Sequence, residues 1–215
     1  MKELMKLKLL YQLQMLNEEY FDSFNIKKDI SKTVPKDLKE LQNVVLNCNL
    51  CNLAKTRKNV VFGEGNSNAK LMFIGEAPGR DEDLQGRPFV GRSGEMVTKM
   101  IQNVLELKRE DVYIANIIKC RPPQNRDPEE NEVESCIGYL FKQIDIIKPK
   151  IIVTLGRIAF RHLLNDTTPI TRARGKIYDF KGIKVIPTFH PSYLLRNPSK
   201  KREVMLDLKL IKEFL

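Results

Sequence analysis

With 215 residues and 42% hydrophobic content, the chain can form one sizeable α/β domain with an appendage. Four cysteines are a poor disulfide framework for a domain of this size, and no apolar run approaches the ~18 residues of a membrane span or resembles a signal peptide, so we expect a cytoplasmic protein without membrane contacts. The formal net charge of +10 favours a polyanionic partner over a neutral one.

The first 40 residues are expected to form an extension to the main domain. Leucines recur at helical spacing near the start of the chain, as at Leu4, Leu7 and Leu10, and a polar stretch follows them. This pattern predicts an N-terminal helical extension and linker over residues 1–40, ahead of a domain over residues 41–215. The apolar face of the helix either packs on that domain or serves as a docking arm for a partner.

Beyond the extension, short apolar runs rich in β-forming residues alternate with helical segments. Each run is long enough for a strand that is buried on both faces. We predict strands at residues 71–75, 112–118, 151–156 and 184–189, and helices at residues 94–107, 129–147, 157–164 and 200–215. A local hairpin across Lys181 is also compatible with the sequence. The alternation is typical of an α/β fold with a largely parallel central sheet of about four strands and helices on both sides.

The unusual residues of the chain follow the predicted strands directly. The phrase GEAPG begins at the end of the first strand, residues 116–126 follow the second, and His190 follows the last. In an open parallel sheet, the carboxyl ends of the strands form the crevice in which ligands bind. We therefore expect residues more than 110 positions apart to meet in one site.

Four cysteines form a candidate metal site. Cys48 and Cys51 make a C-x2-C pair, whereas Cys120 and Cys136 lie 16 positions apart. A C-x2-C turn holds two sulfurs close together, as a metal centre with thiolate ligands requires. The wider spacing of the second pair suits an iron–sulfur cluster as well as a single zinc ion. Spacing alone leaves both metals open, together with four thiols that bind no metal.

Two residues of the predicted crevice carry hydrogen-bonding groups. Asn116 follows apolar residues in a buried strand, where an amide is costly unless its donors and acceptor are paired. It either reads the edge of a pyrimidine or pairs with loop backbone. His190 can donate a hydrogen bond to a leaving group that becomes negative, or it is structural. We expect His162, which lies among apolar residues of a predicted helix, to be structural.

Two glycine-rich loops surround the same crevice. Glu76 lies in GEAPG at the lip of the crevice, a position that favours a functional role over a simple glycine turn. Phe89 lies in the loop GRPFVGRSG and either packs in the core or offers a stacking platform for a planar base.

A strongly basic segment covers residues 156–202. It contains 11 lysines and arginines against two aspartates, a net charge of +9. Because many of these residues lie around proline- and glycine-marked loops, the segment favours contacts with the phosphates of a nucleic acid over a merely solvated face.

Taken together, these motifs closely resemble the family 4 uracil-DNA glycosylases. The resemblance is carried by the C-x2-C pair, by GEAPGRDEDLQGRPFVGRSG at 75–94, by YIANIIKCRPPQNRDP at 113–128 and by PTFHPSYLLRNP at 187–198. It extends from about Asn47 to the C-terminus. Several long motifs occur in order at suitable intervals, so the resemblance is highly specific.

The resemblance implies a three-layer α/β/α fold, a [4Fe-4S] cluster and a uracil pocket. The cluster ligands fall on Cys48, Cys51, Cys120 and Cys136. The pocket falls on Glu76, Ala77, Pro78, Phe89, Asn116 and His190, with catalysis assigned to Glu76 and His190. The expected DNA contacts are Leu194, Leu195, Arg196 and Lys200. Other uracil-DNA glycosylases of the superfamily have a water-orienting aspartate where this chain has Ala77, so the resemblance does not identify the general base.

The implied activity is hydrolysis of the N-glycosidic bond of uracil in DNA, which releases uracil and leaves an abasic site for base excision repair. We expect a monofunctional, monomeric enzyme, whose N-terminal extension is available for a repair or replication partner. Two other functions are compatible with parts of the sequence. A catalytically silent iron–sulfur or zinc module would need the cysteines and the basic surface alone, and an enzyme acting on free nucleotides would have little use for the positive charge.

Overall fold

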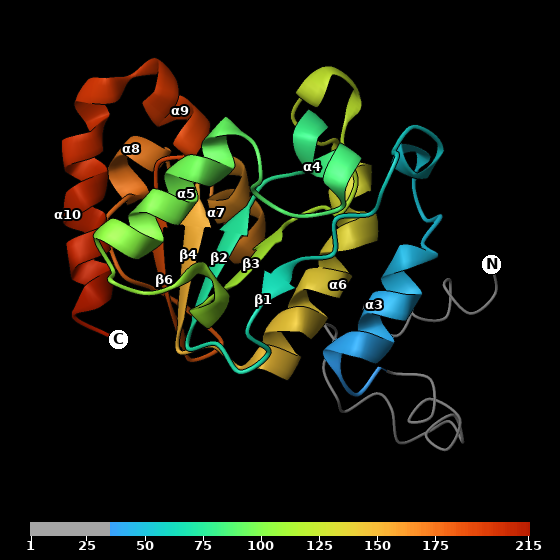
Figure 1. The fold of residues 1–215 in the computed structure, drawn as a ribbon, viewed down its shortest axis with the longest axis horizontal. Helices are drawn as coiled ribbons and strands as arrows, with labels where there is room; N and C mark the ends of the chain where they lie inside the picture. Colours follow the sequence, from blue (N-terminus) through green and yellow to red (C-terminus); the bar gives the residue numbers. More distant parts are fainter. Residues whose placement is uncertain (1–34) are drawn as a thin grey trace.

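The structure, a computed structural model, describes residues 35–215, so most of the predicted extension lies outside the described residues. The described chain has an α/β fold, in which one six-stranded sheet of order β1-β3-β2-β4-β6-β5 lies between layers of helices (Figure 1). The fold class predicted from the sequence is confirmed.

The four central strands are parallel and correspond to the four predicted strands. They are β2 (Leu71–Gly75), β3 (Tyr113–Asn116), β4 (Ile151–Leu155) and β6 (Ile183–Thr188). β3 and β4 pair with opposite sides of β2, and β6 pairs with β4. Because the chain proceeds from β2 toward one edge of the sheet and from β4 toward the other, a topological switch point lies between β2 and β4.

Two short antiparallel strands form the edges, so the sheet has six strands instead of about four. β5 (Tyr178–Phe180) pairs with β6 as the hairpin expected across Lys181, whose φ of +53° is left-handed. β1 (Glu64–Gly65) pairs with β3 and lies outside the predicted elements. A strand of two residues is too short to show any periodicity in the sequence.

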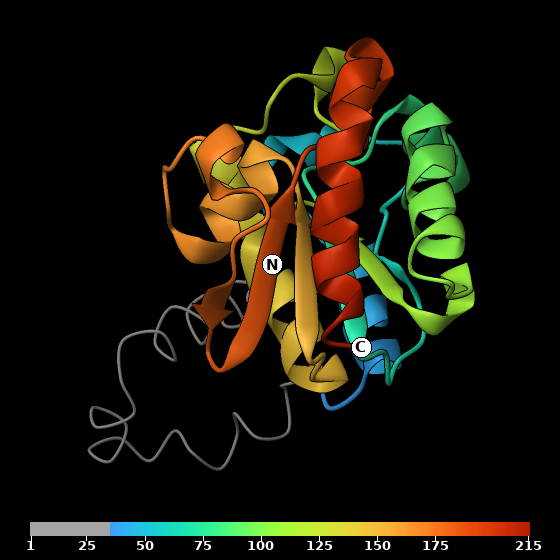
Figure 2. The same ribbon diagram turned by 90° about the vertical axis from the view of Figure 1, so that its left-hand side faces the viewer.

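Helices on the two faces of the sheet enclose two hydrophobic cores. The first core is covered by α3 (Leu38–Leu46), α6 (Glu130–Ile147) and α7 (Arg157–Leu164), and the second by α5 (Arg92–Asn103), α9 (Pro191–Arg196) and α10 (Lys201–Lys212). Figure 2 shows α5 and α10 along the same face. Along β2, Met72 and Ile74 enter the first core, while Leu71 and Phe73 enter the second, as the two-residue period of a strand requires.

The observed helices differ from the predicted ones in number and in one boundary. The predicted helices correspond to α5, α6, α7 and α10, whereas α3, α9 and the short helices α4 (Arg80–Gln85) and α8 (Ile170–Ala173) are additional. α4, α8 and α9 have only one or two turns, which show little periodicity. The boundary expected at residue 40 falls inside α3, whose Leu41 is fully buried. None of the helices within residues 35–215 has the length and hydrophobicity needed to cross a membrane.

Candidate active site

The carboxyl ends of the four parallel strands converge on one cavity of about 610 Å³. Gly75 of β2 lies opposite Asn116 of β3, and Leu155 of β4 lies opposite Thr188 of β6. The loops that continue from these strands face one another across the switch point. The cavity wall includes Glu76, Ala77, Pro78, Phe89, Asn116, His190 and Arg196. The structure therefore brings the six residues of the expected uracil pocket together.

Two glycines let the side chains of the cavity lie close to the sheet. A Cβ on Gly75 would lie 2.4 Å from the Oδ1 of Asn116 and 2.4 Å from the Cζ of Phe89. A Cβ on Gly156, whose φ is +91°, would lie 2.8 Å from the Cβ of His190. A larger residue at either position would push these side chains away from their observed places.

Phe89 forms a wall of the cavity from a strained backbone position. Its φ is +52°, in the left-handed region, which costs a non-glycine residue roughly 1–2 kcal/mol. The residue is only 7% exposed, and its ring centroid lies 6.2 Å from that of His190. Contacts of the surrounding loop must offset the cost of this conformation.

Asn116 is 1% exposed, yet its Oδ1 has no hydrogen-bond partner among the described residues. Leaving a buried acceptor unpaired costs about 1–3 kcal/mol. The main-chain oxygen of Asn116 accepts a hydrogen bond of 2.9 Å from the Nζ of Lys119, which also donates to the Oε1 of Gln143 at 2.7 Å. The backbone at the end of β3 is thus fixed, while the Oδ1 of the side-chain amide stays without a partner in the described part of the chain.

His190 begins α9 and is held in one tautomer by Ser192. The backbone N–H of Ser192 donates to the Nδ1 of His190 at 3.2 Å, and the Ser192 Oγ lies 2.7 Å from the same nitrogen. Since Nδ1 accepts, the neutral ring carries its proton on Nε2. Burial lowers the pKa of His190 to about 4, and the charge of Arg196 acts in the same direction. At neutral pH the ring is therefore an uncharged donor through Nε2.

Glu76 supplies the cavity with a carboxyl group that titrates near neutrality. Burial raises its pKa to about 7, with the charge of Asp127 adding to the effect and that of Arg157 opposing it. Asp127 and Arg157 also line the cavity and pair with each other at 2.6 Å. A carboxyl group with this pKa can accept a proton from water at neutral pH.

The four cysteines line one hollow at the first core, of which Cys48, Cys120 and Cys136 are members. They come from the turn after α3, the loop after β3 and α6, and none of the four forms a disulfide. Two donors point at their sulfurs, as is common around cluster ligands. The Nη1 of Arg57 donates to the sulfur of Cys120 at 3.2 Å, and the backbone N–H of Lys119 donates to the sulfur of Cys136 at 3.2 Å.

The positions and the acidity of the four thiols bear on which metal they could hold. Within residues 35–215, no three His, Cys, Asp or Glu side chains converge closely enough to hold one metal ion. A cluster of several irons instead needs each cysteine to approach a different iron. Burial raises the pKa of Cys136 to about 12 and also raises those of Cys51 and Cys120, so thiolates at these positions need the positive charge that a bound metal provides.

Comparison with known proteins assigns the chain to a family. The sequence model of the Uracil DNA glycosylase superfamily matches residues 62–209. The type-4 uracil-DNA glycosylase of Saccharolobus solfataricus is 48% identical over 179 residues, which cover 80% of this chain and 83% of the relative. That of Archaeoglobus fulgidus is 45% identical over 186 residues, covering 83% of this chain and 93% of the relative. The chain belongs to the type-4 uracil-DNA glycosylase family. The family expected from the sequence is confirmed.

In this type-4 glycosylase, the residues expected to contact DNA differ in exposure. Arg196 is exposed at the cavity wall, and Leu195 is half-buried beside it. Leu194 is 1% exposed and packs in the second core on the inner face of α9, so its side chain offers almost no surface in this structure, and the expected DNA contact stays a prediction. Lys200 is partly exposed, and its Nζ lies 2.6 Å from Glu203.

Several residues around the cavity of this type-4 glycosylase are absent from the sequence-based site. Glu82 lines the cavity and accepts hydrogen bonds from the backbone of Gly79, Val90 and Gly91. Glu82 lies three residues after Gly79, which is the spacing of a helix-capping glutamate, and this spacing is the feature of the sequence by which it could have been found. Asp127 and Arg157 carried no such local signal, because they meet only through the pairing of β3 with β2 and of β2 with β4.

Proposed function

We propose that this chain removes uracil from DNA by hydrolysing the bond between N1 of the base and C1′ of deoxyribose. A base inside a duplex cannot reach a cavity at the end of a sheet, so the nucleotide must be flipped out of the stack at a cost of a few kcal/mol. Arg196, exposed at the cavity wall, supplies a phosphate contact, and the half-buried Leu195 serves as the wedge that takes the place of the flipped nucleotide in the stack.

The flipped base is recognised by stacking and by an amide. Uracil stacks on the ring of Phe89, while the free Oδ1 of Asn116 accepts from N3–H and its Nδ2 donates to O4. Cytosine has an amino group at C4 and no proton on N3, so it presents the opposite pattern to the same amide. Rejection of cytosine therefore follows from hydrogen bonding at one edge.

Catalysis is assigned to His190 and Glu76. As the N1–C1′ bond lengthens, both of its electrons pass to uracil, and the Nε2–H of His190 stabilises the negative charge that develops on O2. Glu76 orients a water molecule and accepts its proton as the water oxygen bonds to C1′. The uracil anion is then protonated from solvent, and an abasic site remains. No lysine lines the cavity in the described part of the chain, which supports a monofunctional enzyme.

The unpaired Oδ1 of Asn116 carries this proposal, because it leaves a buried acceptor beside an aromatic ring and a neutral histidine in one cavity. A DNA-binding module without catalytic activity would not need an unpaired amide, an aromatic ring and a neutral histidine in one cavity. The direct test is incubation with an oligonucleotide containing one uracil, followed by alkaline scission at abasic sites. Cleavage at uracil, with none at cytosine or thymine in matched oligonucleotides, is expected. Intact uracil DNA at stoichiometric enzyme would overturn the proposal.

The four cysteines are proposed to hold a [4Fe-4S] cluster. When bound, the cluster supplies a cross-link between the turn at Cys48 and Cys51, the loop at Cys120 and the helix at Cys136. The hollow that they share and the donors directed at their sulfurs support this ligand set. Anaerobically purified protein should contain about four irons and four sulfides per chain, and zinc alone would contradict the proposal.

A further inference from the structure

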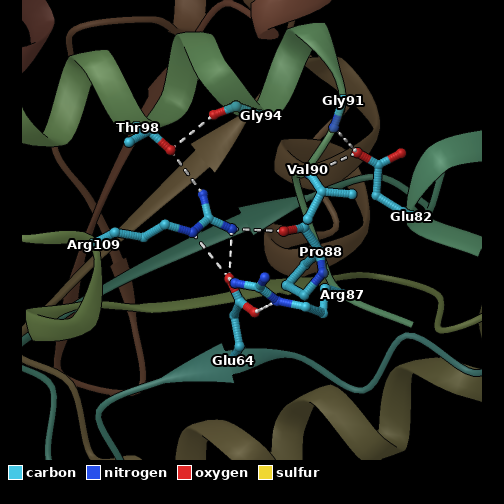
Figure 3. Close-up of polar contacts among 9 residues, drawn as sticks. All are labelled: Glu64, Glu82, Arg87, Pro88, Val90, Gly91, Gly94, Thr98 and Arg109. Atoms are coloured by element: carbon cyan, nitrogen blue, oxygen red, sulfur yellow. Dashed lines mark hydrogen bonds and ion pairs between the residues drawn. The ribbon is translucent and has the colours of Figure 1, made fainter. Parts of the chain in front are cut away.

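The loop that carries Phe89 (residues 86–91, the Phe89 loop) is held by hydrogen bonds to its backbone on either side of Phe89 in the sequence. On one side, the Nη2 of Arg109 donates to the main-chain oxygen of Pro88 at 2.6 Å. On the other side, one carboxylate oxygen of Glu82 accepts from the backbone N–H of Val90 at 2.9 Å and of Gly91 at 3.0 Å. Figure 3 shows these two attachments flanking the loop.

Arg109 itself is held by a matched set of acceptors. Its Nε and Nη2 donate to one oxygen of Glu64 at 2.9 and 2.7 Å, and its Nη1 donates to the Oγ1 of Thr98 at 3.1 Å (Figure 3). The side chains of Arg109 and Glu64 are only 20% and 24% exposed, so this ion pair is shielded from much of the solvent. The guanidinium thus links the edge strand β1 and helix α5 to the Phe89 loop.

Arg109 does not reach the cavity where catalysis is proposed. It lines a separate shallow hollow, and among the described residues Phe89 alone lines both that hollow and the cavity. Any influence of Arg109 on the base must therefore pass through the position of the loop and of the Phe89 ring.

The ring has little freedom to move without changing the cavity. Its Cζ lies where a Cβ on Gly75 would clash, directly beside the Oδ1 of Asn116. On the other side of the residue, a Cβ on Gly94 would lie 1.9 Å from the main-chain oxygen of Phe89, so α5 packs against the loop without a gap. Since the backbone of Phe89 is left-handed, release of the neighbouring carbonyl would let the loop relax and shift the ring.

We infer that Arg109, anchored by Glu64, is a positioning residue that holds the Phe89 ring in place to stack on the flipped uracil. The inference rests on the proposed function. It adds a residue of the edge of the sheet to base recognition, although this residue touches neither the base nor the reacting atoms. The alternative role is a brace between β1 and α5 that stabilises the fold without affecting the base.

The test compares Arg109→Met with Arg87→Met. Arg109→Met removes every donor of the guanidinium but keeps a long side chain, whereas Arg87→Met removes the other partner of Glu64, a 2.8 Å contact, and leaves the Pro88 carbonyl bound. For Arg109→Met we expect a single-turnover excision rate about tenfold lower and a Ki for free uracil about tenfold higher, the size typical of losing one charge-assisted hydrogen bond. Arg87→Met should change either value less than about twofold.

Two further measurements separate positioning from bracing. Affinity for DNA with an abasic-site analogue should be unchanged in Arg109→Met, because that ligand has no base to stack. In a Phe89→Ala background, Arg109→Met should lower the excision rate no further, since a residue that acts through the ring has no effect once the ring is gone. Independent, multiplying effects of the two substitutions would overturn the inference.

Outcomes for the inference and for the proposed function are distinct. A lower melting temperature with a wild-type Ki for uracil in Arg109→Met would assign Arg109 the bracing role and reject the inference alone. Absence of uracil excision by the wild-type chain would reject the proposed function. If Arg109→Met does not fold, Glu64→Gln replaces it, and we then expect a rise of about threefold in the Ki for uracil, as a weakened anchor predicts; a wild-type Ki would again reject the inference.

Discussion

The Nζ of Lys119 donates a hydrogen bond of 2.9 Å to the main-chain oxygen of Asn116, and the backbone N–H of Lys119 donates to the sulfur of Cys136. Lys119 is 1% exposed, so both contacts are shielded from water. One residue therefore connects the proposed cluster site with the strand end that carries Asn116, the residue proposed to read the base. The metal site and the pocket are expected to respond together when either is disturbed.

Cys120→Ser tests this coupling. The variant should lose the brown colour and most of the iron, melt at a lower temperature and excise uracil more slowly, because the loop that contains Cys120 and Lys119 loses its attachment. Iron and sulfide analysis, thermal melting and single-turnover kinetics are the measurements. Wild-type activity and stability in iron-free protein would show that the two sites are independent.

His190→Ala should lower the single-turnover excision rate roughly 10²–10³-fold, as loss of one preorganised donor to a developing negative charge typically does. DNA affinity should change little, because the ring is directed at the base. Ser192→Ala is the matched control: it removes the hydroxyl near Nδ1 but keeps the backbone N–H that fixes the tautomer, so its effect should be much smaller. Rates within a few-fold of wild type for His190→Ala would remove His190 from the mechanism.

Excision should increase with pH through the pKa of Glu76. The carboxyl group must be ionised to accept a proton from water, and burial places its pKa at about 7, so the rate should rise between pH 6 and pH 8, roughly one unit on either side of that value. His190, with a pKa of about 4, stays neutral throughout this range and adds no dependence of its own. In Glu76→Gln the rate should be roughly 10²-fold lower at pH 8 and flat across the range. The same midpoint in both proteins would assign the titration to another group.

The central strands were predictable because each is an apolar run buried on both faces, with a chemically distinctive residue at its end. Gly75, Asn116 and His190 could be placed in one crevice on that basis, since parallel strands end at the same edge of a sheet. The same reasoning could not place Leu194. A helix of six residues has too few turns for its inner face to be identified from sequence, and in the structure the Leu194 side chain packs in the core.

The residues that hold the site in place, such as Glu64 and Arg109, could not be predicted from the sequence either. Glu64 and Arg109 are 45 positions apart and meet only because β1 pairs with β3, and the two residues of β1 give no periodic signal. Ionic contacts of this kind depend on tertiary placement, whereas hydrophobic patterning reports only which face of an element is buried.

Binding to DNA should weaken steeply with salt, because phosphate contacts release counterions, with a slope of about −0.9 in log K against log [salt] for each contact. Arg196→Glu should lower affinity and flatten the slope by about one contact. Lys200→Glu should do less, since Lys200 already pairs with Glu203. The control is reversal of Lys70 and Lys150, exposed at the amino ends of β2 and β4, away from the cavity. An equal loss of slope in the control would place the DNA surface elsewhere.

Asn116→Asp should lower uracil excision on the order of 10²-fold, because an ionised carboxylate offers no donor to O4 and leaves a negative charge facing an acceptor. Affinity for DNA with an abasic-site analogue should stay unchanged, since Asn116 is proposed to touch only the base. Asn103→Asp, the same change at an exposed position near the end of α5, serves as the control and should leave excision intact. The loss should arise in the chemical step and in the Ki for free uracil, and the melting temperature should also fall, because an ionised carboxylate is costly to bury at a position that is 1% exposed. Unaltered excision and base preference in Asn116→Asp would mean that another group reads the base.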